Sequence, residues 1–294
     1  MSHPHPEPER GREPFVATGY LEEYRERGFA VVRGLFRDDE VAEIAAAFDR
    51  IHAEGLRHPS SYRHQNVLFR QGMDARLGRI LRLVQWPSYF DATLDAVRLD
   101  ERVLDVLEPL IGGDLKQIIN QMHWKPPGAA SAEFAFHQDI RFRRPRAAFR
   151  DLAASYVQTG LAIDPHTPLS GCMRMLPGSH RLGELSLGAD GPVLDRRASE
   201  AELARAGLDP AGLVDLALEP GDFAIWHLLT VHGSGPNRSA GDRRFYINGY
   251  VTADNADRGV WAFRNKRACP LGEPVLIHYE DLYRRPGPFY LEAG

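Results

Sequence analysis

A run of short strand-like segments between residues 115 and 252 constrains the fold of this chain more than any other feature. Alternating or briefly continuous apolar residues predict strands at six places: 115–124, 134–140, 155–163, 172–177, 222–228 and 243–252. Helical spacing is found mainly earlier, at 21–27, about 40–52 (with Asp38 or Asp39 as its expected cap) and about 89–111. Helices followed by many short strands are typical of an α+β, mainly β, chain with a sandwich or barrel core.

Length and composition indicate one catalytic domain. We assign residues 1–14 to a disordered polar tail and residues 15–294 to a single domain, an ordinary length for a decorated β-barrel. Residues 181–218 interrupt the strands with glycine, aspartate, alanine and a helical piece near 199–206. This insertion is therefore a candidate lid.

Charge and hydropathy exclude several classes of partner. A formal charge of -4 and a pI near 6.3 give no bulk attraction for nucleic acid or for an anionic membrane. No stretch approaches the ~18–20 apolar residues of a membrane span, and the polar N-terminal segment lacks the apolar core of a signal peptide. The two cysteines, Cys172 and Cys269, are no disulfide framework, so we expect a cytoplasmic protein. Its oligomeric state stays open.

His137 and Asp139 lie two positions apart in Phe134-Ala-Phe-His-Gln-Asp-Ile140. Residues two apart on an extended segment point to the same face, so these side chains can hold one metal ion together. His232, which enters a turn rich in glycine and proline, is available as a third ligand. Two histidines and one carboxylate, with half of the coordination sphere open, are the ligand set of non-haem Fe(II) oxygenases. His227 is the alternative ligand, but its place inside an apolar strand indicates a core role.

An arginine follows His232 after eleven residues, at the start of the run 243–251. The run alternates, so Arg243 shares a face with Phe245 and Ile247, while Arg244 falls on the opposite face. The first face is the more apolar and should point into a core. A buried arginine needs an anionic partner, and a dicarboxylate cosubstrate would supply one that matches the planar guanidinium. We expect Arg244 to lie in solvent.

In combination, these features resemble the phytanoyl-CoA dioxygenase family. The resemblance runs from about residue 15 to about residue 255. It rests on three motifs: His137-Gln-Asp139, Gly171-Cys-Met-Arg-Met-Leu-Pro-Gly-Ser-His180, and His232-Gly-Ser-Gly-Pro-Asn-Arg-Ser239 followed by Arg243. It implies a double-stranded β-helix (a jelly-roll, cupin-like core) flanked by N-terminal helices. It also implies an Fe(II)/2-oxoglutarate-dependent dioxygenase.

The resemblance assigns roles to site residues. The three metal ligands named above would bind iron and act in catalysis, and Arg243 would bind the distal carboxylate of 2-oxoglutarate. Ser234 matches a further position that contacts this cosubstrate, and Gln121 and Lys125 fall on the strand that lines its pocket. His123, on the same strand, is another candidate for the pocket wall. O2 would be the other reactant, and ascorbate is expected to support activity in vitro.

Substrate recognition is predicted only in outline. The resemblance places residues 257–294 on the substrate side, where several side chains suit a small organic molecule: Trp261, Phe263, Arg264, His278, Tyr279 and Tyr283. Four arginines closely follow the His-x-Asp motif: Arg141, Arg143, Arg144 and Arg146. They could meet an anionic group, but a solvated loop is the simpler interpretation.

The expected reaction is the hydroxylation, or another oxidation, of an unactivated C–H bond in a small molecule of specialised metabolism, with release of succinate and CO2. Asp139 favours hydroxylation, because related halogenases have a small residue at this place that leaves room for chloride. Two alternatives stay open: a cupin-like isomerase or hydrolase that uses Zn²⁺, and a non-catalytic small-molecule-binding barrel. Neither gives a reason for Arg243 inside a barrel.

Overall fold

The computed structural model describes residues 19–129, 132–187, 199–275, 277, 284–285 and 287–291. The expected tail, the central part of the candidate lid (188–198), and His278, Tyr279 and Tyr283 lie outside the described residues. No helix in the described ranges has the length and apolar character needed to cross a membrane. The α-helices are α1 (Gly19–Arg27), α2 (Asp38–Arg57), α3 (Ala92–Arg98), α4 (Glu101–Ile111), α5 (Leu152–Ser155) and α6 (Glu200–Arg205).

The N-terminal helices form where helical spacing predicts them, but their ends differ. α2 begins at Asp38, so the two aspartates expected as its cap are its first helical residues. The Glu40 carboxylate instead accepts a hydrogen bond from the Arg37 backbone N–H at 2.8 Å. The long helical stretch predicted next is divided into α3 and α4, because the Asp100 side chain accepts the Arg102 N–H and starts a new helix.

An antiparallel sheet of eleven strands forms the larger part of the fold. Its main path has the order β1-β10-β7-β12-β5-β4-β3-β2-β15, and β13 pairs with β5 and β14. Four of the predicted strands lie here, as β5, β7, β10 and β12. The strands are β1 (Phe29–Val32), β2 (Tyr62–His64), β3 (Val67–Asp74), β4 (Gly78–Gln85), β5 (Leu115–Lys125), β7 (Tyr156–Ala162), β10 (Phe223–His227), β12 (Arg243–Thr252), β13 (Val260–Arg264), β14 (Arg267–Ala268) and β15 (Phe289–Tyr290).

A second antiparallel sheet has the order β6-β11-β8-β9. Its strands are short: β6 (Phe134–His137), β8 (Met173–Met175), β9 (Val214–Leu216) and β11 (His232–Ser234). The other two predicted strands lie here, as β6 and β8. The expected α+β, mainly β, class is confirmed, and over the described ranges the two sheets do not close into a barrel.

The sequence did not predict β2, β3 and β4. β3 shifts its register against β4 between Arg70 and Gln71. Such a bulge breaks the two-residue alternation that identifies a strand. The omission matters for the site, because β4 lies beside β5 and supplies Leu83 and Gln85 to the interior.

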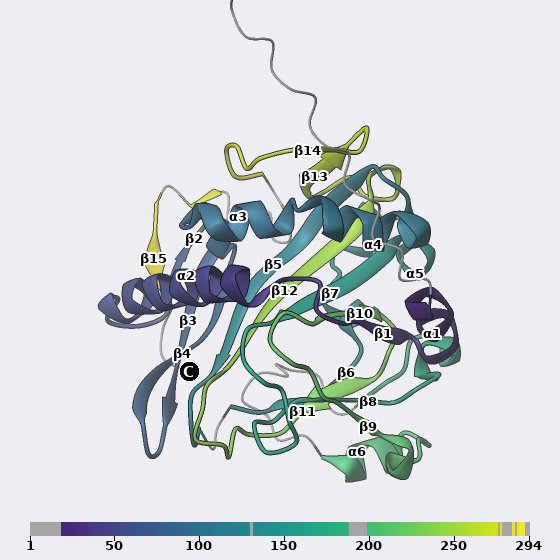
Figure 1. Cartoon of the computed structure of the whole chain (residues 1–294), viewed down its shortest axis with the longest axis horizontal. Helices are drawn as coiled ribbons and strands as arrows, with labels where there is room; N and C mark the ends of the chain where they lie inside the picture. Colours follow the sequence, from purple (N-terminus) through teal and green to yellow (C-terminus); the bar gives the residue numbers. More distant parts are fainter. Residues whose placement is uncertain are drawn as a thin grey trace, which may run out of the picture.

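Helices α2, α3 and α4 cover one face of the large sheet (Figure 1). The buried cluster between them includes Phe48, Leu94, Leu107, Tyr246 and Tyr250. The opposite face of the large sheet packs against the small sheet through a second cluster, which includes Phe29, Met175, Leu216, Trp226 and Phe245. The central strands of the large sheet are therefore buried on both faces, and the space between the two sheets is where the predicted site residues meet.

Candidate metal centre and its cavity

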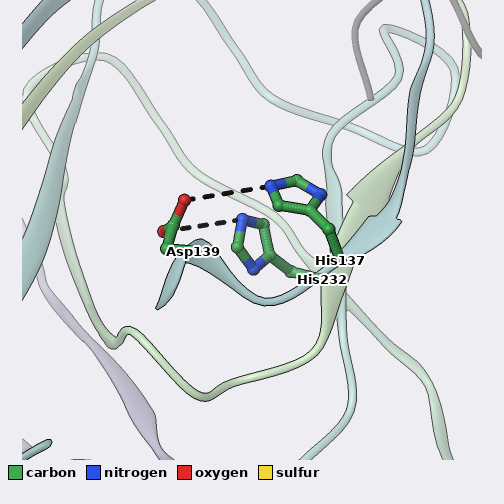
Figure 2. Close-up of side chains that lie close together, drawn as sticks. All are labelled: His137, Asp139 and His232. Atoms are coloured by element: carbon green, nitrogen blue, oxygen red, sulfur yellow. Dashed lines mark ion pairs between the residues drawn. The ribbon is translucent and has the colours of Figure 1, made fainter. Parts of the chain in front are cut away.

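Two histidines and an aspartate meet between the sheets. His137 is the last residue of β6, His232 is the first residue of β11, and the pairing register places them directly opposite each other. His137 Nε2 is 3.8 Å from Asp139 Oδ1, and His232 Nε2 is 3.9 Å from Asp139 Oδ2 (Figure 2). We call these three residues the triad. Over the described ranges, no other group of three His, Cys, Asp or Glu side chains is close enough to share a metal ion.

Asp139 reaches the triad by a different backbone from the one predicted. β6 ends at His137, and Asp139 opens a 3-10 helix, η2 (Asp139–Phe142), instead of continuing a strand to Ile140. Gln138 between them keeps extended angles, with φ -112° and ψ 137°. The two-residue alternation therefore persists to Asp139 although the strand has ended, and the two side chains still converge.

Hydrogen bonds to the backbone orient both imidazoles. His137 Nδ1 lies 2.7 Å from the Ala135 carbonyl oxygen, and His232 Nδ1 lies 2.9 Å from the Thr230 carbonyl oxygen. A carbonyl oxygen only accepts, so each Nδ1 carries the proton. In the neutral ring with the proton on Nδ1, each Nε2, the atom that faces Asp139, keeps its lone pair for a metal ion.

The charge states also suit a divalent cation. Burial, reinforced by His232, lowers the pKa of His137 to about 3, so this ring is neutral at neutral pH. Burial acts to raise the pKa of Asp139, but His232, Arg143, His137 and a hydrogen bond from Trp226 outweigh it and lower the pKa. The Trp226 indole N–H donates to Asp139 Oδ2 at 2.9 Å. Neutral imidazole and ionised carboxylate are the forms that bind metal, so the triad fits an Fe(II) ion.

A cavity of about 230 Å³ adjoins the triad between the two sheets. Most of its wall is apolar and includes Leu83, Ile119, Phe134, Phe142, Phe245 and Ile247. Its polar side chains, apart from the triad, are Gln85, Gln121, His123, Arg143, Gln158, Ser234 and Arg243. Such a wall suits a small molecule that is held by a few directed polar contacts.

Arg243, the first residue of β12, lies in this wall and is 2% exposed. Its Nε and Nη2 atoms are buried and have no hydrogen-bond acceptor in the described part of the chain. Burial lowers the pKa of Arg243 to about 10, because the cation is removed from water without a carboxylate partner. An anion bound in the cavity would satisfy these donors, so Arg243 fits the carboxylate-binding role predicted for it.

The other residues predicted to bind 2-oxoglutarate lie close to Arg243. Lys125 pairs with Arg243 across β5 and β12, but it is not part of the cavity wall. Its Nζ donates to Ser234 Oγ at 2.7 Å and to two backbone carbonyls, and burial lowers its pKa well below the usual value. Ser234 and Gln121 do line the cavity. Gln121 Oε1 lies 2.9 Å from Nε2 of His123, which is also in the wall.

His227, the alternative metal ligand, does not reach the triad. Its Nε2 lies 2.8 Å from the Ala153 carbonyl oxygen, and its Nδ1 accepts the Leu229 N–H at 3.1 Å. Both ring nitrogens therefore have backbone partners elsewhere. This arrangement supports the choice of His232 over His227.

Arg244 corrects a prediction. It lies on the opposite face of β12 from Arg243, as expected, but not in solvent, since its side chain is only 14% exposed. The guanidinium donates to Asp164 at 2.8 Å and to Asp49 of α2 at 3.1 Å. The outer face of β12 is covered by helices, which the alternation of the strand alone could not reveal.

The four arginines after the His-x-Asp motif have different environments. Arg143 is 2% exposed and lines the cavity, whereas the other three are half-buried or exposed and lie outside its wall. The solvated-loop interpretation therefore fits the exposed Arg144 and is wrong for Arg143, while Arg141 and Arg146 are half-buried. Sequence reasoning also missed Trp226 as a partner of Asp139. The apolar run of β10 is typical of a buried strand, but no signal in the sequence connected Trp226 to Asp139.

Two segments predicted to lie near the substrate add no described residue to the cavity wall. Trp261, Phe263 and Arg264 belong to β13, which pairs with the Leu115 end of β5. Leu203 of α6, inside the candidate lid, packs in a cluster behind the small sheet. The cavity wall contains none of the described residues of 181–218 or of the C-terminal segment, so their substrate-side roles stay predictions.

Comparison with known proteins places the chain in a family. A family model described as phytanoyl-CoA dioxygenase matches residues 24–245. The chain is 29% identical over 242 residues to a probable alpha-ketoglutarate-dependent hypophosphite dioxygenase of Stutzerimonas stutzeri, across 79% of this chain and 77% of that protein. It is 26% identical over 234 residues to the peroxisomal phytanoyl-CoA dioxygenase of Rattus norvegicus, across 79% and 67% of the two chains.

A solved structure gives the fold. The epimerase SnoN in complex with Fe³⁺, alpha ketoglutarate and nogalamycin RO superposes with a TM-score of 0.58 at 22% identity, covering 89% of this chain and 95% of that one. The predicted cupin-like fold class is confirmed by this similarity. Because the family model spans most of the sequence, the chain belongs to the phytanoyl-CoA dioxygenase family and is a 2-oxoglutarate-dependent non-haem iron dioxygenase that uses Fe(II), 2-oxoglutarate (alpha-ketoglutarate) and O2.

Proposed function

We propose that this dioxygenase hydroxylates, or otherwise oxidises, an unactivated C–H bond of a small molecule of specialised metabolism. In the hydroxylation, R–H, O2 and 2-oxoglutarate give R–OH, succinate and CO2. The observation that carries the proposal is the position of Asp139: its carboxylate completes the triad directly beside a mostly apolar cavity. A carboxylate at this position supports hydroxylation over halogenation, since it occupies the place that a halide would need.

In this proposal the triad holds the iron and is the catalytic centre. Arg243 binds the distal carboxylate of 2-oxoglutarate, because its two unpaired donors require an anion. Ser234 and Gln121 contact the cosubstrate from the cavity wall. Lys125 holds Ser234 in position through the 2.7 Å hydrogen bond. Bound Fe(II), together with O2, supplies the oxidising chemistry that protein side chains lack.

The surrounding side chains orient the reacting groups and exclude water. The Trp226 N–H holds one Asp139 oxygen, and the two Nδ1–carbonyl hydrogen bonds hold the imidazole rings, so the ligands are oriented before any ion binds. The apolar wall positions a C–H bond near the triad and keeps bulk water from competing reactions.

Kinship alone does not identify the substrate. The two relatives are named for hypophosphite and phytanoyl-CoA, which are chemically distant from each other. We further propose that residues 15–294 form one catalytic domain, with 181–218 as a lid and 257–294 on the substrate side. Over their described residues, neither segment contributes to the cavity wall.

A substrate screen tests the proposed function. Purified protein with Fe(II), ascorbate and air is offered candidate small molecules, and consumption of 2-oxoglutarate and formation of succinate are measured together with the organic product. We expect one oxidised product per succinate, and no product from the Asp139→Ala variant. Conversion that proceeds without 2-oxoglutarate, or with Zn²⁺ in place of Fe(II), would instead support the isomerase or hydrolase alternative.

A further inference from the structure

A second arginine lies in the wall of the cavity, and the proposed chemistry gives it no partner. Arg143 directly follows η2 and is 2% exposed. Its Nη2 donates to the Tyr156 hydroxyl at 2.7 Å and to Gln158 Oε1 at 3.0 Å. Both of these acceptors are uncharged. Its Nε is buried and has no acceptor over the described ranges.

The carboxylate beside Arg143 is that of Asp139, which has other partners. Asp139 Oδ1 lies 4.0 Å from Arg143 Nη2, which is too far for a hydrogen bond. The same carboxylate is the metal ligand of the triad and also accepts the Trp226 N–H. Arg143 is therefore beside the triad, but Asp139 cannot satisfy its free donor.

The cavity wall carries more positive than negative side chains among the described residues. Over the described residues, the wall holds one carboxylate, Asp139, and two guanidinium groups, Arg143 and Arg243. The two positive charges of Fe(II) are matched by the two carboxylates of 2-oxoglutarate. With metal and cosubstrate bound, the cavity therefore keeps one net positive charge, and a desolvated unpaired cation is costly.

We propose that Arg143 binds an anionic oxygen group of the substrate, so that the substrate is a small organic acid with an apolar body. This inference rests on the proposed function, because it assigns the two carboxylates of 2-oxoglutarate to the metal and to Arg243. The apolar side chains of the wall, among them Leu83, Ile119 and Phe142, suit the rest of the molecule. Since Arg143 lies 4.0 Å from a triad oxygen, the C–H bond that reacts is one close to the acidic group.

Binding measurements under nitrogen test the proposal without turnover. Protein loaded with Fe(II) is titrated first with 2-oxoglutarate and then, once saturated, with butanoate, hexanoate and phenylacetate, each compared with its primary amide in a calorimeter. We expect at least one acid to bind about tenfold or more tightly than its amide, as a charge-assisted hydrogen bond predicts. The absence of any such preference across the three pairs would overturn the proposal.

Variants assign the preference to Arg143. Arg143→Gln should abolish it while leaving 2-oxoglutarate affinity unchanged, and Arg143→Lys should keep part of it. Arg144→Gln is the matched control, because it removes the same charge from the exposed neighbouring residue and should keep the full preference. A preference that survives Arg143→Gln would overturn the inference, and so would a loss of 2-oxoglutarate affinity in that variant, which would place Arg143 in the cosubstrate site.

The first titration distinguishes a failure of the proposed function from a failure of the role proposed for Arg143. If wild-type protein loaded with Fe(II) fails to bind 2-oxoglutarate, the proposed function fails. If it binds 2-oxoglutarate but discriminates no acid from its amide, only the assignment of Arg143 fails. Melting curves of each variant show whether the exchange at Arg143 has disturbed its contacts with Tyr156 and Gln158.

Discussion

Replacing Arg243 with alanine should weaken 2-oxoglutarate binding by roughly a hundredfold. Burial lowers the pKa of this guanidinium from 12.5 to about 10. Because a tenfold change in an acid constant corresponds to about 1.4 kcal/mol, the unpaired cation is destabilised by about 3 kcal/mol in the ligand-free protein. A carboxylate that pairs with it offsets a cost of this order, so the variant should lose an affinity of the same order.

Arg244→Ala is the control, because it removes the same side chain from the neighbouring position. Arg244 has protein partners, Asp164 and Asp49, so its loss should lower the melting temperature and leave 2-oxoglutarate affinity nearly unchanged. Arg243→Ala should instead lower 2-oxoglutarate affinity and leave the melting temperature nearly unchanged, since Nε and Nη2 of Arg243 have no hydrogen-bond acceptor over the described residues. The assay is calorimetric titration of 2-oxoglutarate into protein loaded with Fe(II) under nitrogen. Equal losses of affinity in the two variants would refute the reasoning.

Three further predictions concern the triad and the buried histidines. Alanine at any triad position should abolish iron binding and turnover while the protein stays folded, whereas His227→Ala should keep its iron, as metal analysis of the purified variants can show. Asp139→Gly should lose hydroxylation without gaining efficient chlorination in high chloride, because the substitution also leaves the Trp226 N–H without its acceptor. A chlorinated product from this variant or from the wild type, detected by mass spectrometry, would contradict this prediction. Burial lowers the pKa of His123 to about 3 from 6.5, so the unfolded chain binds more protons between these values and stability should fall as pH drops from 6.5 toward 3. This group changes the free energy of unfolding by up to about 1.4 kcal/mol per pH unit. Urea titrations at several pH values should therefore show that the free energy of unfolding of His123→Gln depends less steeply on pH.

The triad and Arg243 could be predicted because their placement depends on a local rule. Side chains alternate along an extended backbone, and this alternation brings His137 and Asp139 together even though the strand ends between them. The same rule separates Arg243 from Arg244. Such arguments need only a few residues on either side, so one sequence is enough to make them.

Features that depend on distant parts of the chain could not be predicted. Arg143 is buried because η2 turns the chain after Asp139, and nothing in the local pattern distinguished it from the exposed Arg144. The partners of Arg244 come from α2 and from the loop after β7. The bulge in β3 hid a strand whose neighbour β4 forms part of the cavity wall.

The small sheet has a consequence beyond catalysis. Its strands contain only three or four residues each, and strands this short have few ladder hydrogen bonds to resist local opening. His137 and His232 sit on its adjacent strands β6 and β11, and Asp139 sits in the turn that follows. An ion held by all three fastens these segments to one another. Bound iron should therefore slow amide hydrogen exchange in β6 and β11, so that the metal stabilises the small sheet as well as taking part in catalysis.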